Sequence, residues 1–234
     1  MRWHGSRMVG VALVSILAGG APLLGGCQAK KVITQSNELT GLKADGNDAY
    51  ARGDYRKALE AYGSYVDQRP QSAWGRYRLG LTYMALNEPR YAREQFAIAH
   101  DLEPENGEYG EALADALLAI GDVAALFEHL DRMAAADRTS AGYLRTAKYA
   151  EKLGFMDEAL AAYRKGVALD GDRSPEPHRA LADFYRRIGD RKGEVRELRK
   201  VLWFDAQDPT ASARLEELGE IVGPSFALEP DAEG

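Results

Sequence analysis

Histidine and cysteine are the residues of this chain whose side chains most often act in catalysis or bind metals. The four histidines stand alone, and none lies at metal-ligand spacing from a second histidine: His4, His100, His129 and His178. Cys27 is the only cysteine, so neither an internal disulfide nor a zinc site built from cysteines can form. The sequence also lacks a Gly-x-Ser-x-Gly motif, a phosphate-binding loop and a dinucleotide fingerprint. We therefore expect no enzyme activity, no bound metal and no cofactor.

Cys27 nevertheless lies at a position where a cysteine can be modified, directly after an apolar N-terminal segment. The segment Met1–Arg7 carries two arginines and no acid, and the apolar residues 8–24 follow it, which is the layout of a secretory signal. This apolar core is interrupted by glycines and a proline, and a membrane-spanning helix needs roughly 20 apolar residues. The residues Leu24-Gly25-Gly26-Cys27 resemble the bacterial lipobox, in which an aliphatic and two small residues precede the cysteine that receives a lipid. The alternative is an ordinary signal followed by a chance cysteine.

The lipobox resemblance implies an order of segments and a location. Residues 1–26 form a lipoprotein signal peptide, Cys27 carries acyl chains such as palmitate, and the polar residues 27–38, which show no helical stripe, form a lipidated tether. Each acyl CH₂ that enters a membrane contributes about 0.8 kcal/mol to anchoring. Gln28 rather than aspartate follows the cysteine, which resembles the pattern of lipoproteins sent to the outer membrane. We expect a lipid-anchored protein of the bacterial cell envelope that faces the periplasm, with the outer membrane favoured.

The composition describes the body that this anchor would hold. Hydrophobic residues make up 45% and charged residues 28%, which is typical of a folded domain. The net charge is −6, and it becomes −8 when the first 26 residues leave with Arg2 and Arg7. An acidic domain of this kind is not expected to bind nucleic acid.

A pattern recurs through the rest of the chain with a nearly constant period. Residues that readily take a left-handed backbone follow one another at intervals of 34, 34, 33 and 35 residues: Gly53, Asn87, Gly121, Gly154 and Gly189. Small residues also recur, about seven residues before each of these turns: Gly46, Gly80, Ala114, Ala147 and Ala182. A near-constant period of this length indicates a stack of similar helical units rather than one compact core.

The best-preserved unit identifies the kind of repeat. Leu79-Gly80-x-x-Tyr83, followed by Ala92, Phe96 and Pro104, resembles the tetratricopeptide repeat, a helix–turn–helix unit of 34 residues. The resemblance implies an all-α fold: a right-handed superhelical solenoid of about five such units plus a C-terminal capping helix, over residues 39–221. Residues 222–234 contain two prolines and three acids, and we expect an extended or disordered tail.

The resemblance also implies a binding face, because the first helix of each tetratricopeptide unit lines the concave side of the array. Alignment of the five units predicts a groove with an aromatic and apolar zone, an acidic zone and a basic zone: Tyr50, Trp74, Tyr77, Leu81 and Met84; Glu111 and Asp115; Lys148, Arg179 and Arg186. Two other interpretations stay open, namely that Trp74 packs between repeats and that the charged residues form an ordinary solvated face.

These features predict a scaffold or adaptor in envelope assembly. The lipid would hold the chain at a membrane, and the groove would capture another envelope protein or peptide. The alternative is that the basic last repeats, over residues 179–200, bind cell wall or another anionic envelope polymer. The sequence does not decide the oligomeric state.

Overall fold

The computed structural model describes residues 25–171, 173–223 and 226–230, with the backbone alone for residues 25–36. Within these ranges the chain forms helices and loops and contains no strand. The helices, in chain order, are α1 (Gly25–Ala51), α2 (Tyr55–Gln68), α3 (Ala73–Ala85), α4 (Pro89–Leu102), α5 (Gly107–Ile120), α6 (Val123–Asp137), α7 (Ser140–Lys152), α8 (Met156–Asp170), α9 (Glu176–Ile188), α10 (Arg191–Phe204) and α11 (Pro209–Glu217).

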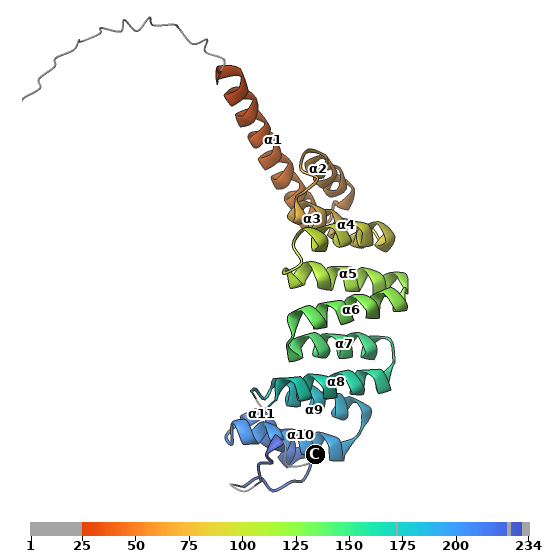
Figure 1. The fold of residues 1–234 in the computed structure, drawn as a ribbon, viewed down its shortest axis with the longest axis vertical. Coiled ribbons are helices and arrows are strands. Elements are labelled where there is room, and N and C mark those ends of the chain that lie inside the picture. The colour runs from red at the N-terminus through yellow and green to blue at the C-terminus, as the bar shows by residue number, and fades with distance from the viewer. Residues whose placement is uncertain (1–24, 172, 224–225, 231–234) are drawn as a thin grey trace, which may run out of the picture.

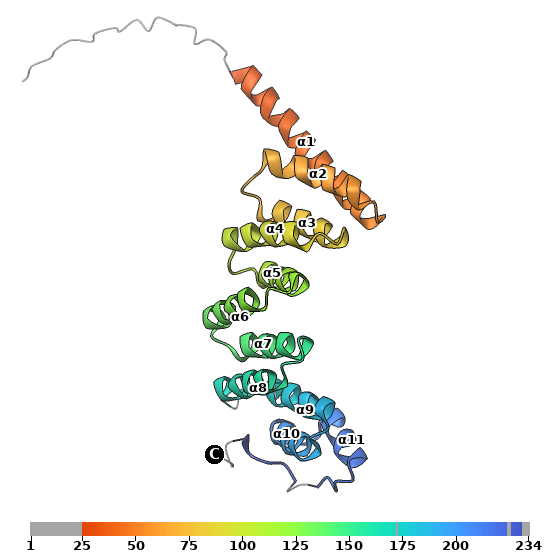
Figure 2. The same ribbon diagram turned by 90° about the vertical axis from the view of Figure 1, so that its right-hand side faces the viewer.

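The helices form five antiparallel pairs that stack along the long axis of the molecule (Figure 1). The first helices α3, α5 and α7 lie toward one side of the stack, and their partners α4, α6 and α8 lie toward the other (Figure 2). The short helix α11 packs on α10 and ends the array. The fold expectation is therefore confirmed: the chain is an all-α tetratricopeptide-type solenoid of five units with a capping helix.

The turn inside each pair is made by the residues that the period identifies. The backbone angle φ is positive at Gly53 (76°), Asn87 (59°), Gly121 (79°), Gly154 (79°) and Gly189 (79°), which is the conformation that ends the first helix of each pair. In three of the turns the next residue is an aspartate whose carboxylate accepts a hydrogen bond from a backbone N–H of the second helix: Asp54, Asp122 and Asp190. A Gly-Asp dipeptide thus stops one helix and starts the next.

Each pair is held by a small residue that faces a large one. A Cβ atom added at Gly46 would lie 2.6 Å from Cε1 of Tyr62, and one added at Gly80 would lie 2.5 Å from Cε1 of Phe96. Both rings are almost completely buried. The large residue follows the small one by 16 positions in both pairs, and the three later pairs keep this spacing with buried alanines: Ala114 and Leu130, Ala147 and Tyr163, Ala182 and Leu198.

The last repeat departs from the repeat pattern at one position, where a buried glutamate forms an ion pair with the capping helix. Glu194 occupies a position where the repeat usually has alanine, and it is only 4% exposed. Its carboxylate accepts two hydrogen bonds from the Arg214 guanidinium of α11, at 2.6 and 3.2 Å. Because an unpaired carboxylate would be costly to bury, this ion pair explains both the glutamate and the position of the capping helix.

The N-terminal region differs from its expected form. Residues 27–38, expected as a lipidated tether without a helical stripe, belong to α1, which runs unbroken from Gly25 and projects from the array (Figure 1). Most of the expected signal peptide, residues 1–24, lies outside the described residues, and nothing is described of the Cys27 side chain. Among the described residues, no helix is both long enough and apolar enough to cross a membrane.

The described part of the C-terminal tail, which was expected to be extended or disordered, folds back along α10. Its described residues 222–223 and 226–229 have no regular secondary structure. Arg199 Nε donates to the Phe226 carbonyl at 2.8 Å, and the Leu228 N–H donates to the Arg199 carbonyl at 3.1 Å. The Phe226 ring lies 4.7 Å from the Arg199 guanidinium and packs against the core of the last repeat.

The contact between Gly80 and Phe96 predicts opposite effects for two glycine substitutions. We expect Gly80→Ala to lower the free energy of unfolding by about 1–2 kcal/mol, because the new methyl group overlaps a buried ring. Gly63→Ala in α2 is the control, since a Cβ there meets nothing within 4 Å, and it should raise stability by about 0.5–1 kcal/mol. Urea unfolding followed by circular dichroism measures both, and a neutral Gly80→Ala variant would contradict the close approach.

A buried histidine makes the middle of the array sensitive to pH. His129 is 2% exposed, and its Nε2–H donates to the Gly110 carbonyl at 2.8 Å. Burial holds the pKa of His129 below its ordinary value, and the nearby His100, Arg132 and Arg145 add to this effect, while the hydrogen bond to Gly110 opposes it. The folded chain therefore keeps this imidazole neutral at pH values where the unfolded chain protonates it.

This shift predicts that the contribution of neutral His129 to the free energy of unfolding is fully present above the ordinary imidazole pKa, about 6.5. That contribution is lost progressively as the pH falls below this value. Each pH unit costs up to about 1.4 kcal/mol until the pH reaches the lowered pKa of the folded state. We expect His129→Gln, which retains a donor for the Gly110 carbonyl but does not titrate, to lose less stability between about pH 7 and pH 5. Urea midpoints across this range measure the difference, and parallel pH profiles for the two proteins would refute the assignment to His129.

Candidate functional site: a groove across three repeats

Two adjoining cavities open on the face formed by the first helices of the second, third and fourth repeats. The cavity between α3 and α5 has a volume of about 270 Å³, and that between α5 and α7 about 410 Å³. Glu111 and Asp115 of α5 line both. We call the continuous hollow the groove.

The wall of the groove on α3 is apolar. Tyr77, Leu81 and Met84 lie at positions i, i+4 and i+7, so one face of α3 presents all three, and each is partly buried. Phe96 of α4, which is 1% exposed, lies beneath them. We call these four residues the apolar socket. The Tyr77 ring also packs 4.9 Å from that of Tyr109, between ring centres, so the socket is continuous with the core.

An acidic row runs along α5 beside the socket. It consists of Glu108, Glu111 and Asp115, at positions i, i+3 and i+7, and all three are exposed. The Tyr77 hydroxyl donates to Glu108 at 2.8 Å, and the Tyr149 hydroxyl donates to Asp115 at 2.8 Å. Burial, together with these carboxylates, raises the pKa of both tyrosines well above the ordinary value, so both hydroxyls stay protonated as donors at neutral pH.

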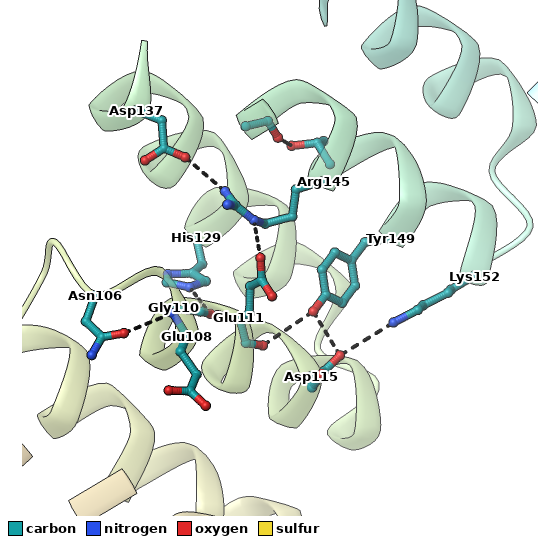
Figure 3. A network of polar contacts seen from close by, with 12 residues as sticks. Asn106, Glu108, Gly110, Glu111, Asp115, His129, Asp137, Arg145, Tyr149 and Lys152 are labelled. Atoms are coloured by element: carbon teal, nitrogen blue, oxygen red, sulfur yellow. Dashed lines mark hydrogen bonds and ion pairs between the residues drawn. The ribbon is translucent and has the colours of Figure 1, made fainter. Parts of the chain in front are cut away.

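A basic flank on α7 closes the other side of the groove. It consists of Arg145, Lys148 and Lys152, which again share one helix face. Arg145 is 18% exposed and lies between two acids, with Nε 2.9 Å from Glu111 and Nη1 3.0 Å from Asp137 (Figure 3). The Lys152 ammonium is 3.5 Å from Asp115, with both side chains about half exposed. The polar contacts in Figure 3 therefore hold α7 against α5. Lys148 is exposed and lines the groove.

The groove brings together most of the residues that the sequence analysis selected. Six of them line it: Tyr77, Leu81, Met84, Glu111, Asp115 and Lys148. Trp74 instead packs edge-on against Tyr65 of α2, with 5.3 Å between the ring centres, and the Lys43 ammonium lies 4.0 Å from the centre of its ring. Trp74 therefore packs between repeats, as the alternative interpretation of the sequence has it. Tyr50 lies in the same N-terminal cluster, 5.3 Å from Tyr55.

Of the expected basic zone, Lys148 lines the groove, whereas Arg179 and Arg186 of α9 do not line either of its cavities. Arg179 forms an ion pair with Asp208, the N-cap residue of α11, so this arginine connects α9 to the capping helix. Arg186 pairs with Asp183 one turn earlier on the same exposed helix face. The cations that line the groove lie one repeat earlier, on α7.

The groove residues that sequence reasoning missed include Arg145 and Tyr149, which hold α7 against α5. A signal for both exists in the period of the repeat. Arg145 follows its partner Glu111 by 34 residues, and Tyr149 follows its partner Asp115 by the same interval. Polar residues at equivalent positions of successive first helices are neighbours in a solenoid, so complementary types one period apart predict such contacts.

The described residues contain no group of three or more histidine, cysteine, aspartate or glutamate side chains that could hold a metal ion. Asp170 accepts hydrogen bonds from the backbone N–H groups of Arg173 and Ser174 and closes the loop between α8 and α9.

Comparison with known proteins supports the architecture. No protein-family model and no curated protein matches the chain. Among solved structures, the MamA protein is 20% identical with a TM-score of 0.53, over 81% of this chain and all of that one. MamA from Desulfovibrio magneticus RS-1 is 17% identical with a TM-score of 0.50, over 74% of this chain and 97% of that one. YrrB, described as a TPR protein, is 17% identical over 80% of this chain and 97% of that one, with a TM-score of 0.47. Identities this low bear on the fold alone, and the YrrB match, with a TM-score below 0.5, carries no argument. The five stacked helix pairs, together with the two MamA matches, show the fold of a tetratricopeptide-type solenoid.

Proposed function

We propose that this chain is a lipid-anchored scaffold of the bacterial cell envelope, facing the periplasm, that captures a protein partner in the groove and catalyses no reaction. One observation carries the proposal: three successive first helices line two adjoining cavities in which apolar side chains lie beside an acidic row and a basic flank. A protein segment matches such a surface because it can offer apolar and charged side chains at short, regular spacing.

The apolar socket is the part of the groove that gives affinity. Leu81 and Met84 lie at the opening of the socket rather than inside the repeat core, although their inner atoms pack on it. Covering such partly exposed side chains removes apolar surface from water, at about 25 cal/mol per Å². Side chains of this kind at the centre of an interface usually dominate binding energy, while the charged rim contributes register and specificity.

The anchor concentrates the groove at a membrane. A lipid on Cys27 would confine the chain to the membrane surface and would raise its effective concentration toward membrane partners. The helical form of residues 27–38 supports the idea of a spacer, because twelve helical residues span about 18 Å between the lipid and the array. The outer membrane is the favoured site, because Gln28 follows the cysteine.

Binding of an anionic polymer by the last repeats has less support. Several arginines of α9 are engaged by acids of this chain: Arg179 by Asp208, Arg186 by Asp183 and Arg187 by Glu151. Such internal pairs leave less uncompensated positive charge for a polymer than the sequence alone indicates.

The anchor is tested by metabolic labelling with a tagged fatty acid. We expect the wild-type chain to incorporate the label and the mature chain to begin at an acylated Cys27, because this is the only thiol available. Cys27→Ser should abolish the label. Mass spectrometry of the N-terminal peptide is the second readout, and a mature N-terminus elsewhere would exclude a lipoprotein.

The groove is tested by photocrosslinking in living cells, with a photoreactive amino acid at Lys148, an exposed groove position. We expect a crosslinked partner in the wild-type background and at least about a tenfold loss of the adduct when Leu81→Ala and Met84→Ala are combined. Tyr77 is left intact because its ring also packs in the core.

The matched control removes two exposed apolar side chains outside the groove, with Phe155→Ala and Met156→Ala at the turn into α8. This variant should give wild-type crosslinking, and all three proteins should keep the same helical circular dichroism signal. An adduct that survives the loss of Leu81 and Met84, or that forms equally from a photoreactive residue at the outer position Lys165, would discard the groove.

A further inference from the structure

We infer that the cavity of the groove between α3 and α5 is occupied by a cationic segment of the partner in which basic and apolar residues alternate. The inference rests on the proposed function, since it names the chemistry of what the groove captures. It follows from the charge beside the apolar socket, from the spacing of the acidic row and from the engagement of the nearby cations.

The charge around the socket has one sign. The residues that line this cavity include three acids, Glu108, Glu111 and Asp115, and no base. The partners of Glu108 and Asp115 include the neutral hydroxyls of Tyr77 and Tyr149, which orient the carboxylates without cancelling their charge. A ligand that places an apolar group in the socket therefore brings its neighbouring residues close to these three carboxylates. Their negative charge favours lysine or arginine beside the apolar group.

The nearest cations compensate this rim only in part. Arg145 divides its guanidinium between Glu111 and Asp137, so one positive charge serves two carboxylates. Lys152 approaches Asp115 at 3.5 Å, but both side chains are about half exposed, and pairs of this kind contribute less than about 1 kcal/mol. A basic residue of a ligand can replace Lys152 at little cost, and it would meet no cation near Glu108 among the residues that line the socket.

The spacing of the acidic row favours an extended ligand. Seven residues of helix separate Glu108 from Asp115, a rise of about 10 Å, which an extended peptide spans with about three residues. Successive side chains of an extended peptide point to opposite sides. A segment lying between α3 and α5 would therefore direct alternate residues toward the apolar socket and the others toward the acidic row (Figure 3 shows the acids along one helix).

The same charges disfavour the chain's own acidic tail as the occupant. The sequence of the tail carries Glu229, Asp231 and Glu233, which the acidic row would repel. The described part of the tail docks on α10 at the far end of the array. The occupant is therefore expected to be a segment of another protein.

The test measures binding of a labelled peptide with a Lys-Leu-Lys-Leu-Lys core to the full-length chain in neutral detergent, by fluorescence anisotropy. We expect binding that weakens about tenfold when Glu108→Gln, Glu111→Gln and Asp115→Asn are combined, because three partly exposed charge pairs are lost. These amides can still accept the hydrogen bonds of Tyr77 and Tyr149, so the fold should persist. Peptides with glutamate in place of lysine, or serine in place of leucine, should bind at least tenfold more weakly than the parent.

The matched control neutralises three exposed acids of the second helices, with Glu94→Gln, Glu128→Gln and Asp131→Asn. It should bind the parent peptide within about twofold of wild type. Equal affinity of the groove variant and wild type, or equal binding of the glutamate peptide, would overturn the inference.

Different results would contradict the cationic specificity of the groove and the proposed function. If the photocrosslinked partner is lost with Leu81 and Met84 but is captured normally by the charge-neutralised variant, the groove stands and its cationic specificity falls. If crosslinking from Lys148 never depends on Leu81 and Met84, the proposed function falls, and the inference falls with it.

Discussion

The structure depends on one repeated contact, the close approach of a small residue on the first helix of each pair to a large side chain on the second. At Gly46 and Gly80 the ring of the partner occupies the space that a Cβ would need. A single helix pair of about 30 residues cannot bury enough apolar surface to be stable alone. The contact brings the two helices together and leaves the outer face of each pair to be covered by the next repeat, so the stack and its exposed first-helix face are consequences of the same packing.

That packing explains which side chains are free for function. In α3, Gly80 faces Phe96 of the partner helix and Leu79 packs with the preceding repeat, and both are buried. Leu81 and Met84 are only partly buried and line the groove. In α5, Leu113 and Ala114 are buried, whereas Glu111 and Asp115 are exposed. Since a helical turn takes 3.6 residues, positions one or two apart fall on different faces, and the exposed acids Glu111 and Asp115 are not needed to fill the core. Their chemistry can therefore follow a partner.

The period of the sequence was sufficient to predict the helix pairs, the turns and the packing residues, because these depend on contacts within one repeat. Asn87 shows how far this reasoning extends, since its place in the period predicted a left-handed backbone that the structure has. The positions of Trp74 and Arg179 could not be predicted in this way. Trp74 meets rings of the preceding helix, and Arg179 meets the cap of a helix that is not part of the repeat. Such contacts depend on what a neighbouring element offers, which a repeat alignment does not contain.

The polar residues of the groove both hold neighbouring helices together and face a ligand. The number of acids and cations in the groove is therefore constrained by both requirements. Tyr149 and Arg145 hold α7 against α5 through Asp115 and Glu111, the same acids that face the groove. If the groove were lined only by acids, their mutual repulsion would push the first helices apart, and if each acid had its own buried cation, no charge would remain for a ligand. The array lies between these extremes: neutral hydroxyls and one shared guanidinium hold the acids in place. The repeat interface can therefore stay closed while the cavity between α3 and α5, which is lined by three acids and no base, keeps a net negative charge.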